Sequence, residues 1–339
     1  MRRKVISWLF WVIVLCGLLG TVAFLSFSVG SVGMSLEEIF RAVFKDKATT
    51  QHTILFGIRL PRIILALAVG GALSLAGVIL QGIFRNPLVE PYTLGISGGA
   101  AVGVCLNIVL RLNQSLGVIT LPLFGFLGAI LVVILVYSLS IRKGILKISD
   151  LLLAGVMISF ISSSLVMLIM SVCRTEDLHG IIFWIMGSLE GPEELLTRLV
   201  LGMSILGLVI SYLFCFDLNA FSLGEEEAVH LGVNVERTKR SLFILASLLT
   251  AFSVSVAGII GFVGLVVPHF VRMFIGRDHR ILLIGSFLCG GSFLILCDTL
   301  ARTLISPVEL PVGVITGVFG GSLFIYALTK KKTILLGKR

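Results

Sequence analysis

Long apolar stretches alternate with short polar loops along almost the whole chain. Because a helix needs about 20 residues to cross the hydrocarbon core of a bilayer, most of these stretches are candidate membrane spans. The ten candidates are residues 5–28, 63–84, 92–110, 116–140, 149–172, 194–216, 241–262, 264–276, 281–304 and 312–329. Only 264–276 is too short to cross alone. The pattern predicts an all-α polytopic membrane protein with about ten transmembrane helices in one domain over residues 1–339.

Composition supports the membrane assignment. Hydrophobic residues make up 57% of the chain and charged residues 13%, with a mean hydropathy of +1.10. Soluble domains are about a quarter charged. The net charge of +9 would suggest nucleic acid in a soluble protein, but here the basic residues lie mainly in short loops between apolar stretches. This positive-inside pattern excludes nucleic acid as a partner and makes membrane lipid the solvent.

The basic loops predict the orientation, with both termini in the cytoplasm. The predicted cytoplasmic loops contain Arg85, Arg142, Lys143, Lys147, Arg237, Lys239, Arg240, Arg277, Arg280, Lys330, Lys331 and Lys332. Most acidic residues, including those between 176 and 194, fall on the outer side. Arg59, Arg62 and Arg302 also fall there, where the rule disfavours cations. Their position calls for a specific role.

The longest polar loop on the cytoplasmic side covers residues 217–240. Ser222 followed by Glu225 predicts a capping box, and Gly232 is a plausible C′ residue, so a short surface helix is expected between them. Ala228 and Leu231 would give this helix a small apolar patch that suits a groove on a partner. An ordinary solvated connector fits the sequence equally well.

A proline turn follows the glycine-rich second span. Asn86, Pro87 and Leu88 form a polar stop at the predicted cytoplasmic mouth, because proline lacks an N–H and biases the preceding residue away from helix. Such a rigid, non-helical segment suits a constriction in a transport pathway. The alternative is a plain turn between helices.

The sequence offers no candidate for catalysis, a metal site or a cofactor. Its six cysteines lack paired spacing, and its five histidines are dispersed. No G-x-x-x-x-G-K-[ST] phosphate loop is present, so any ATP hydrolysis must take place on another subunit.

Several segments resemble, in order, the permease subunits of bacterial ABC importers of the FecCD/BtuC type. They begin with RLPRIILALAVGG…RNPLVEPYTLGI at 59–96 and GEEEAVHLG at 224–232. GIIGFVGLVVPHFVRMFIGRDHR at 258–280, CDTLAR at 297–302 and ELPVGVITGVFGG at 309–321 follow. Together they span most of the chain from Arg59 onward. Their order is more specific than any one of them.

The resemblance implies a type II ABC importer permease in the bacterial cytoplasmic membrane. Such a permease pairs with a second copy or a homologue, two cytoplasmic ATP-binding subunits and an extracytoplasmic substrate-binding protein. The implied cargo is a ferric siderophore, haem or cobalamin, and the chain itself is not an enzyme.

The resemblance also implies roles for individual residues. Arg59, Arg62 and Arg302 would dock the binding protein. The ATPase-coupling segment would comprise Gly224, Glu225, Ala228, Leu231 and Gly232. Asn86 and Leu88 would form part of the cytoplasmic gate.

Other interpretations remain open from the residues alone. Arg59 and Arg62 would then anchor a helix end, and Asp298 would pair with Arg302 one turn away. An ion-coupled secondary transporter normally needs ionisable residues near the middle of its spans, and here Asp150 and Asp298 lie toward span ends. A membrane scaffold would explain the glycine stripes, Gly99 with Gly103 and Gly313 with Gly317 and Gly321, but not the ordered segments.

Overall fold

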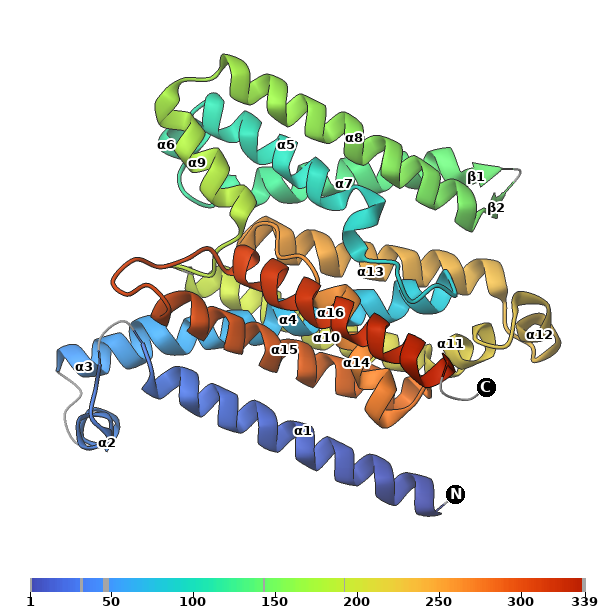
Figure 1. The fold of residues 1–339 in the computed structure, drawn as a ribbon. Helices are drawn as coiled ribbons and strands as arrows, with labels where there is room; N and C mark the ends of the chain where they lie inside the picture. Colours follow the sequence, from blue (N-terminus) through green and yellow to red (C-terminus); the bar gives the residue numbers. More distant parts are fainter. Residues whose placement is uncertain (1, 31–32, 45–48, 143, 192, 337–339) are drawn as a thin grey trace.

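The computed structural model describes residues 2–30, 33–44, 49–142, 144–191 and 193–336 as an all-helical bundle (Figure 1). Each of the ten predicted spans contains one main helix, so the predicted fold class is confirmed. These helices are α1 (Arg2–Ser28), α4 (Leu60–Ile83), α5 (Ile96–Val109), α7 (Thr120–Ser140), α8 (Ile148–Val172), α10 (Glu194–Leu213), α13 (Val235–Ala257), α14 (Val263–Ile275), α15 (His279–Thr303) and α16 (Val312–Leu336).

Seven of the described helices are long and apolar enough to cross a membrane, and α5, α14 and the apolar part of α16 are shorter. One helix begins later than predicted and another ends earlier, because the backbone turns at glycine. Gly95 has a φ of +78° where a short 3-10 helix, η2 (Pro91–Leu94), meets α5, and Gly258 has a φ of +70° at the end of α13. Only glycine adopts these values without steric cost.

Short elements connect the spans. They are α2 (Leu36–Phe44), α3 (Thr50–His52), the π-helix η1 (Thr53–Arg59), α6 (Leu112–Leu116), the two-stranded hairpin β1 (Ile141–Arg142) and β2 (Ile145–Leu146), α9 (Thr175–Met186), α11 (Cys215–Phe221) and α12 (Glu225–His230). The sequence pattern did not predict α9, since its first turn is acidic and it lies within the expected outer loop.

The connections gather at two ends of the bundle. The start of α1, the hairpin, α12 and the end of α16 lie at one end, called here the α12 end, while α2, α6 and α9 lie at the opposite α9 end (Figure 1). This division agrees with the predicted assignment of loops to two sides. Which end faces the cytoplasm remains a prediction.

Helix α4 lies at the centre and packs against α10, α13, α14 and α15. Its most apolar window is 89% buried, whereas the corresponding windows of α1 and α8 are only 17% buried. The close packing depends on glycine: a Cβ on Gly77 would lie 1.9 Å from the carbonyl oxygen of Gly264. Small residues therefore let these backbones approach, as is typical of membrane bundles.

The two predicted glycine stripes behave differently. Gly99 and Gly103 face α7, and a Cβ on Gly103 would lie 2.1 Å from the carbonyl oxygen of Phe124, so this stripe packs helices as predicted. On α16, a Cβ on Gly313 would collide with the carbonyl oxygen of Met186 at 2.3 Å, but Gly317 has open space around it. Within the described chain, the α16 stripe therefore makes a close backbone contact at Gly313 but not at Gly317.

Candidate functional site

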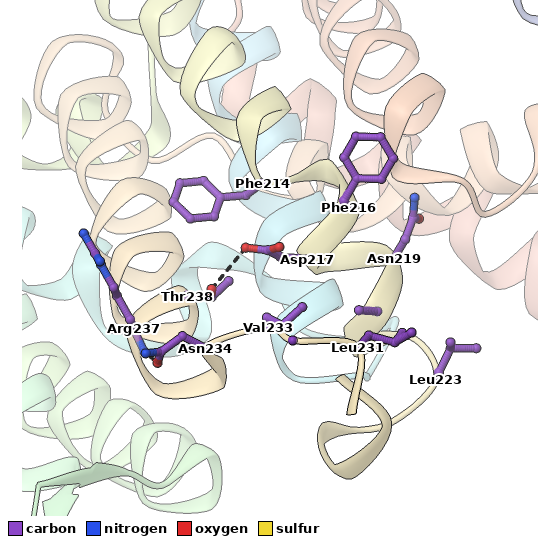
Figure 2. Close-up of a pocket in the computed structure, with 12 residues that line it drawn as sticks. Phe214, Phe216, Asp217, Asn219, Leu223, Leu231, Val233, Asn234, Arg237 and Thr238 are labelled. Carbon is purple, nitrogen blue, oxygen red and sulfur yellow. Dashed lines mark hydrogen bonds between the residues drawn. The ribbon is translucent and has the colours of Figure 1, made fainter. Parts of the chain in front are cut away.

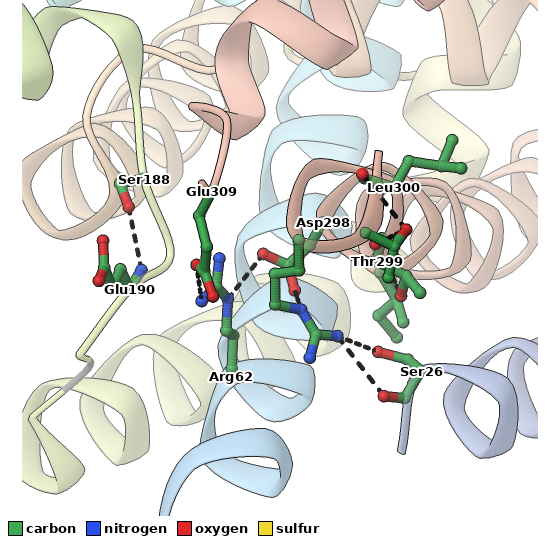
Figure 3. A network of polar contacts seen from close by, with 11 residues as sticks. Ser26, Arg62, Ser188, Glu190, Asp298, Thr299, Leu300 and Glu309 are labelled. Carbon is green, nitrogen blue, oxygen red and sulfur yellow. Dashed lines mark hydrogen bonds and ion pairs between the residues drawn. The ribbon is translucent and has the colours of Figure 1, made fainter. Parts of the chain in front are cut away.

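A buried cluster of charges joins three helices at the α9 end (Figure 3). Arg62 on α4 contacts Asp298 on α15, with 2.8 Å between Nε and Oδ1, and Glu309 before α16, with 2.7 Å between Nη1 and Oε2. Asp298 also pairs with Arg302 one turn later, at 3.1 Å between Oδ2 and Nε. Arg302 in turn donates from Nη2 to the Ser26 hydroxyl of α1 at 2.8 Å. The cluster therefore ties α1, α4 and α15 together.

Arg59 anchors the neighbouring helix end. Its Nη1 donates to the carbonyl oxygens of Phe27 at 2.8 Å and Ser28 at 3.0 Å, the last two residues of α1. Terminal carbonyls of a helix lack partners within the helix and carry its negative dipole end, so a guanidinium is well placed there. A Cβ on Gly30 would lie 2.6 Å from Arg59 Nη2, so a larger residue there would have to displace the guanidinium.

The three arginines predicted to dock a binding protein are thus not displayed on the surface of this chain. Arg59, Arg62 and Arg302 are only 3–4% exposed. The i, i+4 pairing of Asp298 with Arg302 and the anchoring of a helix end by Arg59 are both present, as the alternative interpretation expected. Sequence reasoning missed the bond from Arg62 to Asp298, which joins residues 236 positions apart.

Helix α12 forms where the sequence predicted a surface helix, but its start differs. Gly224 occupies the N-cap without any side-chain cap, while Ser222 donates to the Asn219 carbonyl oxygen at the end of α11. The predicted capping box is therefore wrong, because Ser222 ends one helix instead of starting the next. Glu225 instead accepts a hydrogen bond from Lys239 at 2.6 Å, which ties α12 to α13.

The end of α12 agrees with the prediction. Gly232 has a φ of +85°, its N–H donates to the Val229 carbonyl, and the Val233 N–H donates to the Ala228 carbonyl. This pair of bonds is a Schellman motif with Gly232 at C′. Ala228 is fully buried whereas Leu231 is 63% exposed, so the predicted joint patch of these two side chains is wrong.

The exposed apolar side chains around α12 are instead Leu223, Val229 and Leu231. A cavity of about 690 Å³ lies beside them between α11 and the start of α13 (Figure 2). Leu223 and Leu231 line it, and the hydrogen bond from Thr238 to Asp217 closes its wall at 3.1 Å. An exposed apolar rim with a cavity behind it is a surface suited to a protein partner.

The Asn86–Leu88 turn lies at the α12 end and is exposed in the single chain. The Leu88 N–H donates to Asn86 Oδ1 at 3.0 Å, which makes a local turn, and the Leu88 side chain is 54% exposed. Helix α4 ends at Ile83 before this turn, as the proline predicted. The turn is therefore an exposed, non-helical loop that directly follows the central helix.

An unwound segment between α13 and α14 is a second feature that the sequence reasoning missed. Glu90 Oε1 accepts from the Phe262 N–H at 2.6 Å, and the Tyr92 hydroxyl binds both the N–H and the carbonyl of Ile260 at 3.2 and 3.0 Å. Gln81 donates to two carbonyls of the first turn of α14. Non-helical backbone inside a membrane protein needs such internal partners. The glycines of GIIGF at 258–262 were the available signal.

At the α12 end, Asp278 connects α11 to the start of α15. Hydrogen bonds from Arg280 and Asn219 hold the pKa of its carboxyl at about 2. The carboxylate is therefore ionised throughout the physiological range and serves as the N-cap of α15. In the described part of the chain, no three His, Cys, Asp or Glu side chains gather as metal ligands do.

Known proteins resemble this chain over most of its length. The model of the FecCD transport family matches residues 18–330. The chain is 39% identical to the hemin transport system permease protein HmuU of Yersinia pestis over 93% of this chain and 94% of that protein. It is also 39% identical to the cobalamin import system permease protein BtuC of Halobacterium salinarum, over 84% of this chain and 75% of that protein.

A solved structure shares the same fold. It is an inward-facing conformation assigned to a metal-chelate type ABC transporter, 32% identical in sequence, and it superimposes with a TM-score of 0.83 over 95% of this chain and 99% of that one. The likeness covers the central bundle, the α12 end and the α9 end together. The chain therefore belongs to the FecCD transport family.

Proposed function

We propose that this chain, a multi-pass permease of the cytoplasmic membrane, forms the pathway of an ATP-driven importer for a metal chelate. The family match over residues 18–330 carries the proposal, because it includes the central bundle and both of its ends. The cargo is a ferric siderophore, haem or cobalamin, since similar permeases are named for hemin and cobalamin transport. The chain acts as one permease domain over residues 1–339, without catalytic or cofactor-binding residues of its own.

In this proposal the chain pairs with a second permease, identical or homologous, and with two cytoplasmic ATP-binding subunits. A substrate-binding protein delivers the cargo from outside. Purifying the tagged chain in mild detergent and identifying the subunits by native mass spectrometry tests this assembly. The expected result is a complex of two permeases and two ATP-binding subunits, and isolation of the chain without an ATP-binding subunit under conditions that preserve known importers would contradict it.

In this proposal, α12 couples ATP hydrolysis on the ATP-binding subunits to movement of the membrane spans. Gly224 and Gly232 bound the helix, Glu225 ties it to α13 through Lys239, and Ala228 is its buried inner face. Leu231 belongs to the outer face that an ATP-binding subunit contacts. Because Lys239 lies on a helix that packs on α4, movement of α12 is transmitted to the centre of the bundle. Asn86 and Leu88 then form part of the gate at the same end.

Docking of the binding protein remains the proposed role of Arg59, Arg62 and Arg302. Because all three side chains are buried, a carboxylate of the binding protein must displace a group that now covers them. An incoming carboxylate can reach Arg62 only by replacing Glu309. The Glu309 side chain is 28% exposed, compared with 1% for Asp298 and 5% for Arg62. Exchange of one carboxylate for another keeps the guanidinium paired, which a buried charge requires.

Replacing Glu309 with glutamine is therefore expected to strengthen binding-protein association. The variant removes the competing charge while Asp298 continues to pair with Arg62, so folding is retained. A gain of about threefold to tenfold in affinity is expected, or about 0.7–1.4 kcal/mol. This is less than close charge pairs at interfaces contribute, because the glutamine amide still competes for Arg62 as a hydrogen-bond acceptor. Surface plasmon resonance against the reconstituted permease measures it.

Glu190→Gln is the matched control, because Glu190 is an exposed acid at the same end without a contact to Arg62. The affinity of the Glu190→Gln permease for the binding protein is expected to stay at the wild-type value. A Glu309→Gln variant that folds and binds no more tightly than Glu190→Gln would count against docking through Arg62.

A further inference from the structure

A basic cavity of about 600 Å³ lies at the α12 end, beside the Asn86–Leu88 turn. Three arginines line it: Arg85 from the turn that follows α4, Arg272 from α14 and Arg277 from the loop that follows α14. Among the described residues that line this cavity, none is acidic. The adjacent carboxylate of Asp278 is bound by Arg280 and Asn219. The cavity therefore concentrates positive charge and lacks an internal anion to balance it.

An apolar groove of about 280 Å³ adjoins the basic cavity. Phe274 lines both, and on α16 Leu323 lines the groove while Ala327, one turn later, lines the basic cavity. The groove is walled by apolar side chains of α1, α14, α15 and α16, with Trp11 and Leu15 contributed by α1. Helix α1, which forms one wall of the groove, lies along the outside of the bundle (Figure 1).

We propose that the cavity and the groove together hold one anionic phospholipid. The phosphate lies among Arg85, Arg272 and Arg277, and an acyl chain lies in the groove. Arginines bind phosphate oxygens in a bidentate manner, and basic pockets between membrane helices on the cytoplasmic side are suited to anionic headgroups. An apolar groove that begins at the headgroup cavity matches the shape of a lipid and not that of a small anion.

The depth of the site supports this assignment. Trp8 at the start of α1 stacks on Arg280, whose Cζ lies 4.6 Å from the ring centroid. Tryptophan concentrates at the level of the lipid headgroups, so this end of α1 lies at the membrane interface. Since most of α1 is exposed, a lipid between α1 and α14 would add contacts that the chain alone does not provide. The site does not depend on the identity of the cargo.

The test compares lipid binding by the full-length chain and its variants in native mass spectrometry. The probes are phosphatidylglycerol, phosphatidylcholine and inorganic phosphate. An Arg272→Gln/Arg277→Gln double variant is expected to bind phosphatidylglycerol about 30-fold more weakly, since each arginine near a membrane surface contributes about fivefold. Phosphatidylcholine binding is expected to change little.

Arg237→Gln is the matched control, because Arg237 is an exposed arginine at the same end that lines a different cavity. It is expected to bind phosphatidylglycerol as the wild type does. Unfolding temperatures establish that the variants fold. If the double variant does not fold, the Arg277→Gln single variant, at an exposed position, is expected to bind phosphatidylglycerol about fivefold more weakly than the wild type.

Leu323→Trp separates a lipid from a free anion. Filling the groove is expected to weaken phosphatidylglycerol binding at least tenfold and to leave inorganic phosphate binding unchanged. If wild type and Leu323→Trp bind phosphatidylglycerol equally, no acyl chain occupies the groove. The proposal of a phospholipid is then wrong, and the cavity binds phosphate alone. Equal binding by wild type and the double arginine variant, or equal losses in Arg237→Gln, would overturn the site.

Discussion

Replacing Asp298 with alanine is expected to destabilise the permease by about 3–5 kcal/mol, because it leaves two buried guanidinium groups without their shared carboxylate. Asp298 is 1% exposed and pairs with both Arg62 and Arg302. Removal of one member of a buried ionic cluster costs more than the net stability of the cluster itself. Thermal unfolding of the purified protein, followed by loss of the monodisperse species in size-exclusion chromatography, measures the effect.

The control is an exposed ion pair at the same end. Glu176 lies 3.6 Å from Arg111, and its side chain is 85% exposed. Glu176→Ala is expected to cost no more than about 1 kcal/mol, because solvent screens such pairs. Equal stability of the Asp298 and Glu176 variants would show that the cluster does not hold α1, α4 and α15 together.

Replacing Leu231 with glutamate is expected to weaken association of the ATP-binding subunit by about 30-fold or more. Leu231 is exposed, lies just after the last residue of α12 and lines the rim of the adjacent cavity. The glutamate removes an apolar contact and also places an unpaired charge in the interface, which together cost about 2 kcal/mol or more. Pull-down of the ATP-binding subunit by the tagged permease, with transport measured in parallel, reports the loss.

Two further variants make this experiment specific. Ile145→Glu places the same charge on an exposed apolar position of the hairpin at the same end, and its association is expected to stay near wild type. Ala228→Glu is expected to impair folding, because the Ala228 side chain is fully buried on the inner face of α12. Wild-type association by a folded Leu231→Glu protein would make α12 an ordinary connector.

The spans were predictable because lipid imposes one simple requirement. A backbone in hydrocarbon must satisfy its own hydrogen bonds, so each long apolar stretch becomes a helix. The Asp298–Arg302 pair was also predictable, since it lies within one turn of one helix. Helix α9 was not, because Thr175–Met186 combines an acidic first turn with only a short apolar second half.

Contacts between distant segments set the limit of sequence reasoning. The charges of Arg62, Asp298 and Glu309 were visible, but nothing local indicates that Arg62 reaches over to α15. The burial of Arg62 and Asp298 follows from this contact and was not visible in the sequence either. The predicted start of α12 was wrong for a local reason. Ser222 donates a hydrogen bond back to α11, so Gly224 is the N-cap of the helix.

Energy dependence of uptake tests the central claim most directly. The permease is reconstituted into liposomes with its ATP-binding subunits, and a chelate loaded on the substrate-binding protein is offered outside. We expect accumulation that requires ATP on the side of the ATP-binding subunits and persists when proton and sodium gradients are collapsed. Uptake driven by an ion gradient without ATP would contradict the account and identify a secondary transporter.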